Sequence, residues 1–343
     1  MSTPLVIKRT SLEEDGTFYC EGLSVIGKSH TALDLPCQDY HYCEELDGGW
    51  KLFIVSDGAG SAVRSQEGAR FMCEKAGVYV KQVIDNLGWE NKSTAPSELD
   101  WYIECRAIFS QLKIDIRRQI GIQGEGNEND FSATIILVVY TPNFVLCGHI
   151  GDGRMGYRTK DGVWGSLMIP HKGDEPNQTI FVQSNWTYPQ SPALRLHGVP
   201  VPETRVLSCP IDTIVMMSDG CESFAWDCDV FNESEQRIET INLPFPGFLD
   251  PLVRLLDGLK SSERNVALEK VITEGNELCI EETDDKTIIL ARFLTQSSIS
   301  GQHEETESYI DEPVEEDSTI TNDENIQREV TVLNGVLGDN QPE

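Results

Sequence analysis

Short runs of apolar and β-branched residues recur along the chain up to Phe293, and most of them are bounded by Gly, Pro or Asp. Runs of this length and composition, ended by turn-forming residues, are typical of β-strands. We therefore predict strands at Phe18–Gly27, Lys51–Ser56, Ser132–Tyr140, Phe144–Ile150, Val201–Ser208, Thr213–Ser218 and Lys286–Phe293. Only a three-residue turn separates the third of these from the fourth, and this spacing predicts an antiparallel hairpin.

Two longer segments, Ser65–Asn86 and Glu98–Ile120, carry apolar residues near helical spacing and are predicted as helices. Weaker helical patterns occur at Asp250–Leu259 and Glu263–Thr273. The order is an early strand pair, two helices and then a run of strands. This order predicts an α+β fold in which two antiparallel β-sheets pack as a central β-sandwich flanked by α-helices, and it disfavours a doubly wound parallel sheet.

The composition of the chain becomes strongly acidic near its C-terminal end. From Thr295 to Glu343 there are 13 acidic residues and one basic residue, Arg328, so this segment carries a charge of about −12. It has few large apolar residues and cannot bury enough area to offset its ordering entropy. We predict one folded domain at residues 1–297 and an acidic, disordered tail at 298–343. A solubilising tail is the simpler interpretation, and a docking or autoinhibitory segment is the alternative.

Charge and cysteine usage exclude several classes of function. The formal net charge is −30, which argues against nucleic-acid binding because that needs a basic surface. No stretch of 18 apolar residues occurs, so we expect no membrane-spanning segment. The N-terminus lacks the apolar region of a signal peptide, and the ten cysteines form no C-x-x-C pair. We expect buried thiols in a reducing compartment and a cytoplasmic protein.

Four aspartates stand at the ends of predicted strands. Asp57, Asp152 and Asp219 each follow an apolar strand and precede a glycine, and Asp284 lies just before the last strand. One Asp-Gly pair is a common turn signal and means little alone. In an antiparallel sheet, however, the end of one strand and the start of its neighbour share an edge, so these carboxylates can converge. Clustered carboxylates repel one another unless a cation neutralises them, and all-oxygen ligands suit Mg²⁺ or Mn²⁺.

Six short motifs together resemble the protein phosphatase 2C family, in particular a bacterial branch of it. They occur in the family order between about Gly22 and Phe293, and their combination is far more specific than any one of them. They are Gln38-Asp39, Ser56-Asp57-Gly58-Ala59-Gly60, Ser132-Ala133-Thr134, Gly151-Asp152-Gly153-Arg154, Ser218-Asp219-Gly220 and Asp284-Asp285-Lys286-Thr287. The resemblance implies a helix-flanked β-sandwich and a serine/threonine phosphoprotein phosphatase that hydrolyses phosphomonoesters with a metal-activated water.

The resemblance also implies roles for individual residues. Asp57 would bridge two metal ions, and the Gly58 carbonyl would bind one of them. Asp219 and Asp284 would complete the other metal site, and Asp39 would lie near the second metal, directly or through water. These four aspartates are therefore the predicted catalytic residues.

A third, weaker metal would be held at Asp152. The implied partners are a phosphoprotein substrate and a cognate serine/threonine kinase with its targets.

The chain departs from the family pattern at two positions. Many members carry a phosphate-binding Arg five residues before the position of Asp39, but here that residue is Asp34. Lys28, His30 or Arg64 could take over phosphate binding, and the sequence does not choose among them. Some members have a histidine, a candidate general acid, two residues after the bridging aspartate.

In this chain the residue two positions after Asp57 is Ala59, not histidine, so no residue is assigned as general acid. Because the Asp57–Gly58 pair and the other three carboxylates are intact, an active enzyme is favoured. A pseudophosphatase that binds phosphoprotein with little turnover is the alternative. A calcium-stabilised structural domain is disfavoured because its ligands would fall in one loop.

Two histidines lie near the predicted site. His149 sits in an apolar strand, and a core residue is the simpler interpretation. His171 precedes Lys172-Gly173-Asp174 in a predicted loop. We expect a solvated loop residue there, with a substrate-facing residue as the alternative.

Overall fold

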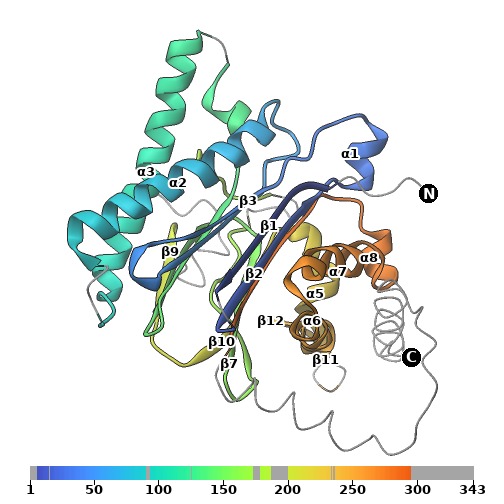
Figure 1. Cartoon of the computed structure of the whole chain (residues 1–343). Coiled ribbons are helices and arrows are strands. Elements are labelled where there is room, and N and C mark those ends of the chain that lie inside the picture. The colour runs from blue at the N-terminus through green and yellow to red at the C-terminus, as the bar shows by residue number, and fades with distance from the viewer. Residues whose placement is uncertain are drawn as a thin grey trace, which may run out of the picture.

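The computed structural model describes residues 6–14, 16–89, 93–124, 126–172, 178–186, 200–232, 234 and 236–294. The predicted acidic tail therefore lies outside the described residues. Two antiparallel sheets pack face to face, and helices cover the outer face of each (Figure 1). The predicted α+β sandwich flanked by helices is confirmed.

One sheet has six strands in the order β1-β2-β13-β10-β7-β8. Its strands are β1 (Val6–Glu14), β2 (Phe18–Val25), β13 (Lys286–Phe293), β10 (Ile211–Met217), β7 (Arg154–Thr159) and β8 (Trp164–Ser166). The other has five strands in the order β3-β4-β5-β6-β9. They are β3 (Tyr40–Glu45), β4 (Lys51–Ser56), β5 (Ile135–Tyr140), β6 (Val145–Ile150) and β9 (Glu203–Leu207).

The central strands are apolar on both faces because both faces are buried. In β4, Leu52 and Ile54 pack under the helices, whereas Phe53 and Val55 face the interior between the two sheets. This double burial explains why such strands read as continuous apolar runs rather than as alternating patterns. The space between the sheets is filled by side chains of both, for example Phe53 from one and Met216 from the other.

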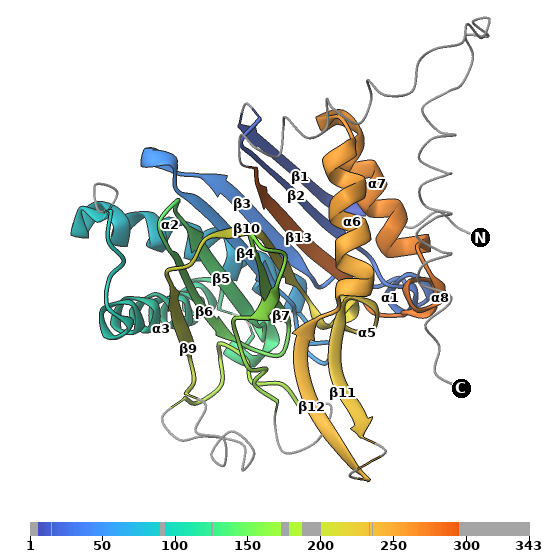
Figure 2. The ribbon, with the colours of Figure 1, turned by 90° about the horizontal axis from the view of Figure 1, so that it is seen from below.

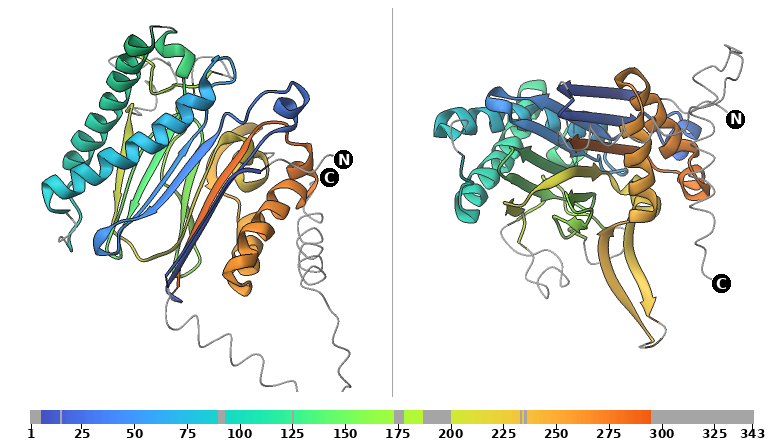
Figure 3. Two further views of the ribbon diagram at one scale, coloured as in Figure 1. Left: turned by 45° about the horizontal axis from the view of Figure 1, so that its top comes forward. Right: turned by 60° about the horizontal axis from the view of Figure 1, so that its bottom comes forward.

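Two helical layers close the sandwich from outside, as the left view of Figure 3 shows. Helices α2 (Ser65–Leu87) and α3 (Glu98–Gln123) pack on the five-stranded sheet, and α6 (Pro246–Gly258) and α7 (Ser261–Glu274) pack on the six-stranded sheet. Short helices complete the description. They are α1 (Lys28–Ala32), η1 (Asp47–Gly49), η3 (Glu128–Phe131), η4 (Asp219–Cys221), α5 (Glu222–Ala225) and α8 (Glu277–Glu281).

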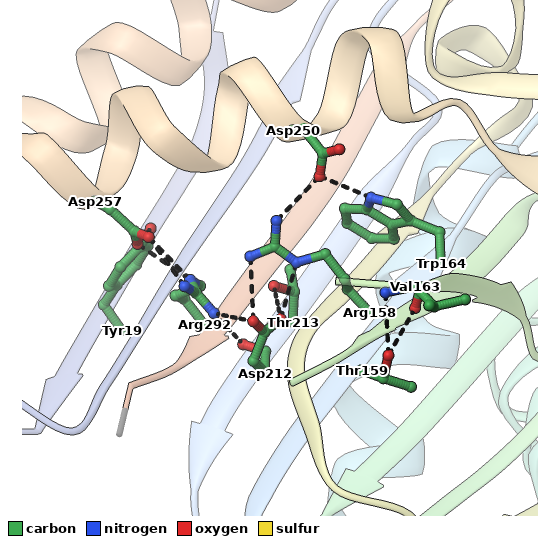
Figure 4. A network of polar contacts seen from close by, with 10 residues as sticks. All are labelled: Tyr19, Arg158, Thr159, Val163, Trp164, Asp212, Thr213, Asp250, Asp257 and Arg292. Atoms are coloured by element: carbon green, nitrogen blue, oxygen red, sulfur yellow. Dashed lines mark hydrogen bonds and ion pairs between the residues drawn. The ribbon is translucent and has the colours of Figure 1, made fainter. Parts of the chain in front are cut away.

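A partly buried ionic network fixes α6 to the six-stranded sheet (Figure 4). Arg292 of β13 pairs with Asp212 of β10 at 2.9 Å and with Asp257 of α6 at 3.1 Å. Arg158 of β7 pairs with Asp212 at 3.0 Å and with Asp250 of α6 at 3.0 Å. Both arginines thus link strands to the helix through charge-assisted bonds.

Four predicted helices and seven predicted strands agree with the structure within a few residues, but several elements were not predicted. Strands β1, β3, β7 and β8 were missed, and so was the hairpin of β11 (Trp226–Asn232) and β12 (Arg237–Pro244). This hairpin pairs with neither sheet and projects from the sandwich (Figure 2).

Within the described part of the chain, no helix is both long and apolar enough to cross a membrane.

Candidate metal-binding active site

The strand order brings Asp39, Asp57 and Asp152 to one rim of the five-stranded sheet. Asp39 precedes β3 and Asp57 follows β4, and these antiparallel strands place Tyr40 opposite Ser56. Strands β4 and β6 both lie antiparallel to β5, so they run in the same direction and end on the same side. Asp152 lies in the short connection from β6 to β7, where the chain passes from one sheet to the other.

The six-stranded sheet supplies Asp219 and Asp284 at the same rim. Asp219 follows β10 and Asp284 precedes β13, and these strands pair with Met217 opposite Ile288. Gly220 permits the closest approach of the two segments. A Cβ atom at this position would lie 2.0 Å from the carbonyl oxygen of Asp285. The glycine after Asp219 is therefore required for backbone packing at the site.

The carboxylates converge on one centre. Ligating oxygens of Asp57, Asp152 and Asp219 all lie within 4.8 Å of one another. These three residues, with Gly58 and Asp284, line a cavity of about 550 Å³. Four strand ends from two sheets thus deliver a cluster of anionic oxygens to one open cleft.

Burial and mutual repulsion make this cluster unfavourable without a counter-ion. Burial, followed by the charges of Asp219 and Asp39, raises the pKa of Asp57 well above its ordinary value. Burial, followed by the charges of Asp152 and Asp284, raises the pKa of Asp219 to about 7. Burial also raises the pKa of Asp284. An all-oxygen anionic donor set of this kind fits a hard divalent cation such as Mg²⁺ or Mn²⁺.

Asp39 lies behind this centre. It is 3% exposed and accepts a hydrogen bond from the Ser218 hydroxyl at 2.6 Å. Burial, followed by the charge of Asp285, raises the pKa of Asp39 well above its ordinary value. Ser218 therefore orients Asp39 toward the rim while connecting it to the segment that carries Asp219.

Neighbouring hydroxyls orient the other ligand candidates. The backbone N–H of Asp57 donates to Thr134 Oγ1 at 2.9 Å. The Thr179 hydroxyl donates to a carboxylate oxygen of Asp152. Thr134 belongs to one of the six family-like motifs, but the bonding partners of both threonines could not be read from the sequence.

Asp285 has a supporting role that the sequence did not suggest. Its two carboxylate oxygens accept the backbone N–H groups of Gly27 and Gln38, each at 2.6 Å. His30 Nδ1 also lies 2.8 Å from Asp285. Asp285 thereby connects the loop before Asp39 with the strand that begins after Asp284. In the sequence, its position directly after Asp284 could have indicated that Asp285 belongs to the site.

The three residues predicted to bind phosphate have other partners in this structure. The Lys28 ammonium donates to the Ile280 carbonyl. Arg64 donates to Glu67 at 2.8 Å and 2.6 Å, to Gln123 at 3.0 Å, and stacks on the Phe131 ring. Arg64 does not line the cleft, whereas His30 does. Phosphate binding by these residues stays a prediction, with His30 the one that faces the cleft.

The expectation that His171 is a solvated loop residue was wrong. His171 is 0% exposed and stacks on His149 with 4.2 Å between ring centroids. The backbone N–H of Gly151 also approaches its Nδ1 at 3.4 Å. His149 is a core residue, as expected.

All ten cysteines are free thiols; seven are buried, and Cys43, Cys209 and Cys228 are partly exposed.

Comparison with known proteins agrees with this architecture. A family model described as protein phosphatase 2C matches residues 26–272. Serine/threonine-protein phosphatase 3 of Escherichia coli (strain K12) is 27% identical over 171 residues, which cover 46% of this chain and 60% of that protein. The match therefore spans less than two thirds of the relative's length.

Solved structures resemble the fold at low sequence identity. Serine/threonine phosphatase Stp1 from Staphylococcus aureus superposes with a TM-score of 0.50 at 12% identity and covers 84% of this chain and 100% of its own. A single-residue variant of a bacterial serine phosphatase gives a TM-score of 0.50 at 12% identity, with 81% and 98% covered.

Proposed function

Because this chain belongs to the protein phosphatase 2C family, we propose that it is a metal-dependent serine/threonine phosphoprotein phosphatase. It would hydrolyse phosphomonoesters at two Mg²⁺ or Mn²⁺ ions held by carboxylates. The observation that carries this proposal is the convergence of Asp57, Asp152 and Asp219, whose ligating oxygens lie within 4.8 Å of one another. The name of the Escherichia coli relative supports the same activity.

Each carboxylate has a proposed task. Asp57 would contribute to both metal sites and the Gly58 carbonyl to one of them. Asp219 and Asp284 would contribute to the other. Asp39, oriented by the Ser218 hydroxyl at 2.6 Å, serves the second metal directly or through water. When bound, the cations lower the pKa of a water and stabilise charge on the phosphoryl group.

Asp152 is proposed to hold a third, weaker ion. Its carboxylate already accepts a hydrogen bond from Thr179, so part of its charge is satisfied by the protein. This hydrogen bond favours a weaker site than the one built around Asp57 and Asp219.

The chain's own residues prepare the cleft for an in-line displacement. The carboxylates fix the charge distribution in advance, so little reorganisation is needed when the substrate binds. Thr134 holds the Asp57 backbone at 2.9 Å and thereby limits movement of the bridging carboxylate. The proposed substrate is a phosphoserine or phosphothreonine protein, with a cognate serine/threonine kinase acting on the same targets.

The test compares hydrolysis of a phosphoserine peptide and p-nitrophenyl phosphate with and without Mn²⁺ or Mg²⁺. Asp57→Asn removes the bridging anion and should lower turnover by on the order of a hundredfold or more. Asp47→Asn is the matched control because Asp47 is exposed on the turn between β3 and β4. A wild-type protein that binds Mn²⁺ but hydrolyses neither substrate would instead indicate a pseudophosphatase.

A further inference from the structure

We propose that Lys172 binds the phosphoryl group of the substrate and is the main protein cation that does so. This inference rests on the proposed function, since it assigns a substrate-binding residue to the same site. A phosphomonoester is a dianion, and a lysine ammonium binds it by charge-assisted hydrogen bonds. The sequence pattern did not single out this residue.

Lys172 lies beside the carboxylate cluster. It lines a second cavity, of about 790 Å³, together with Asp152, Asp219 and Asp284. Those same three aspartates line the catalytic cleft, so the two cavities adjoin at the proposed metal centre. A ligand in the cleft can therefore meet the lysine from this side.

The backbone of Lys172 is fixed to that centre. Lys172 forms an isolated antiparallel bridge with Thr179, and the Thr179 hydroxyl donates to Asp152. Through Thr179, the Lys172 backbone is therefore anchored beside Asp152 at the proposed metal centre.

The Lys172 ammonium is only loosely held. Among the residues that the structure describes, its nearest carboxylate oxygen is on Glu222 at 3.8 Å, and 45% of the lysine side chain is exposed. That distance is too long for a hydrogen bond. Glu222 is instead held by Arg154 at 2.8 Å. The lysine can therefore turn toward a bound phosphate without breaking a strong interaction.

The other cations near this rim are engaged elsewhere. Arg154 is 2% exposed and bound to Glu222. Lys286 is 6% exposed and donates to the Cys279 carbonyl at 2.5 Å. Among the described residues that line the two cavities, Lys172 is the sole lysine or arginine. His30 also faces the cleft, but its ring lies 2.8 Å from Asp285.

The experiment measures binding of inorganic phosphate to the Mn²⁺-loaded full chain by calorimetry, together with kcat and KM for a phosphoserine peptide. Lys172→Gln should weaken phosphate binding about tenfold or more and raise KM, because the charge is lost. Lys172→Arg keeps the charge and should retain most of the affinity. Mn²⁺ affinity and melting temperature should stay within error of wild type in both variants.

Lys81→Gln is the matched control. Its side chain is 38% exposed and pairs with Glu44 at 2.9 Å, on the outer helix α2 away from both cavities. It should leave phosphate binding and KM unchanged. Raising the salt concentration should narrow the difference between wild type and Lys172→Gln, because salt screens a partly exposed charge.

Unchanged phosphate affinity in Lys172→Gln would overturn the inference. So would an equal loss in Lys172→Arg accompanied by weaker Mn²⁺ binding, since that indicates a structural role. Arg195 lies outside the described residues, and a loss in Arg195→Gln but not in Lys172→Gln would assign phosphate binding to Arg195 instead. If wild type neither hydrolyses the peptide nor binds Mn²⁺, the proposed function fails, which is a separate outcome.

Discussion

Replacing Asp219 with Asn should stabilise the metal-free protein and abolish most of its stabilisation by metal. Asp219 stands between Asp152 and Asp284, and burial together with these two charges raises its pKa from the ordinary 3.8 to about 7. The folded state therefore disfavours the charged form. Asn keeps a similar shape and removes the charge that the neighbours repel.

The magnitude follows from the pKa difference. One pKa unit is about 1.4 kcal/mol, so the difference between 3.8 and about 7 corresponds to a penalty of about 4 kcal/mol on the charged form, from burial first and repulsion second. Because the folded pKa is above the unfolded one, this penalty is absent below about pH 4, grows up to about pH 7 and is complete above it. We expect metal-free Asp219→Asn to be roughly 2–4 kcal/mol more stable than wild type at pH 8, with the gap closing toward pH 4.

The assay is chemical denaturation of chelator-treated wild type and Asp219→Asn at pH 4, 6 and 8, repeated at pH 8 with Mn²⁺. A ligand at about a hundred times its Kd stabilises a folded protein by about 2.7 kcal/mol. Wild type should gain on this scale, and the variant should gain little. If metal-free Asp219→Asn is less stable than wild type at pH 8, or if Mn²⁺ stabilises both equally, the electrostatic account of the cluster is wrong.

Three further predictions concern other parts of the molecule. Arg292→Leu should lower the free energy of unfolding by about 2–3 kcal/mol, because Asp257 of Figure 4 loses its cationic partner while Asp212 keeps Arg158; denaturation at neutral pH checks this, and a loss under 1 kcal/mol would contradict it. Gly220→Ala should reduce both activity and Mn²⁺ affinity, because its Cβ would lie 2.0 Å from a backbone oxygen, whereas Gly258→Ala has open space and should be neutral. Deleting residues 300–343 should leave the melting temperature unchanged, since the last core strand ends at Phe293. An autoinhibitory tail would instead reveal itself as a lower KM at low salt after deletion.

The sequence predicted best those elements whose burial is uniform. Strands β4 and β13 were predicted with the observed bounds because both faces of each are buried, which produces unbroken apolar runs. The edge strand β1 was missed because its partly buried positions include Lys8 and Thr10, so no continuous apolar face repeats along it. The β11–β12 hairpin pairs with neither sheet. It therefore lacks the regular apolar face by which core strands were predicted.

The carboxylates of the candidate site could be found from the sequence because each stands at a strand end, and strand ends can be recognised from the local sequence. The partners of a side chain come from segments far apart in the chain, so the sequence did not reveal them. From the sequence Arg64 was a candidate for phosphate binding, but in the structure its guanidinium donates to Gln123 and stacks on the Phe131 ring. His171 appeared to be a loop residue, but the turn after β8 folds it onto His149. Both the partners of Arg64 and the burial of His171 are tertiary contacts, which local sequence does not reveal.

Phosphate release from a phosphoserine peptide by metal-stripped protein, measured while Mn²⁺ is added back, tests the central claim most directly. We predict no turnover after exhaustive treatment with EDTA, saturable recovery with Mn²⁺ or Mg²⁺ in wild type, and little recovery in Asp57→Asn, which lacks the bridging carboxylate. Full activity after exhaustive chelation, or normal recovery in Asp57→Asn, would contradict a reaction that depends on metal ions held by this carboxylate cluster.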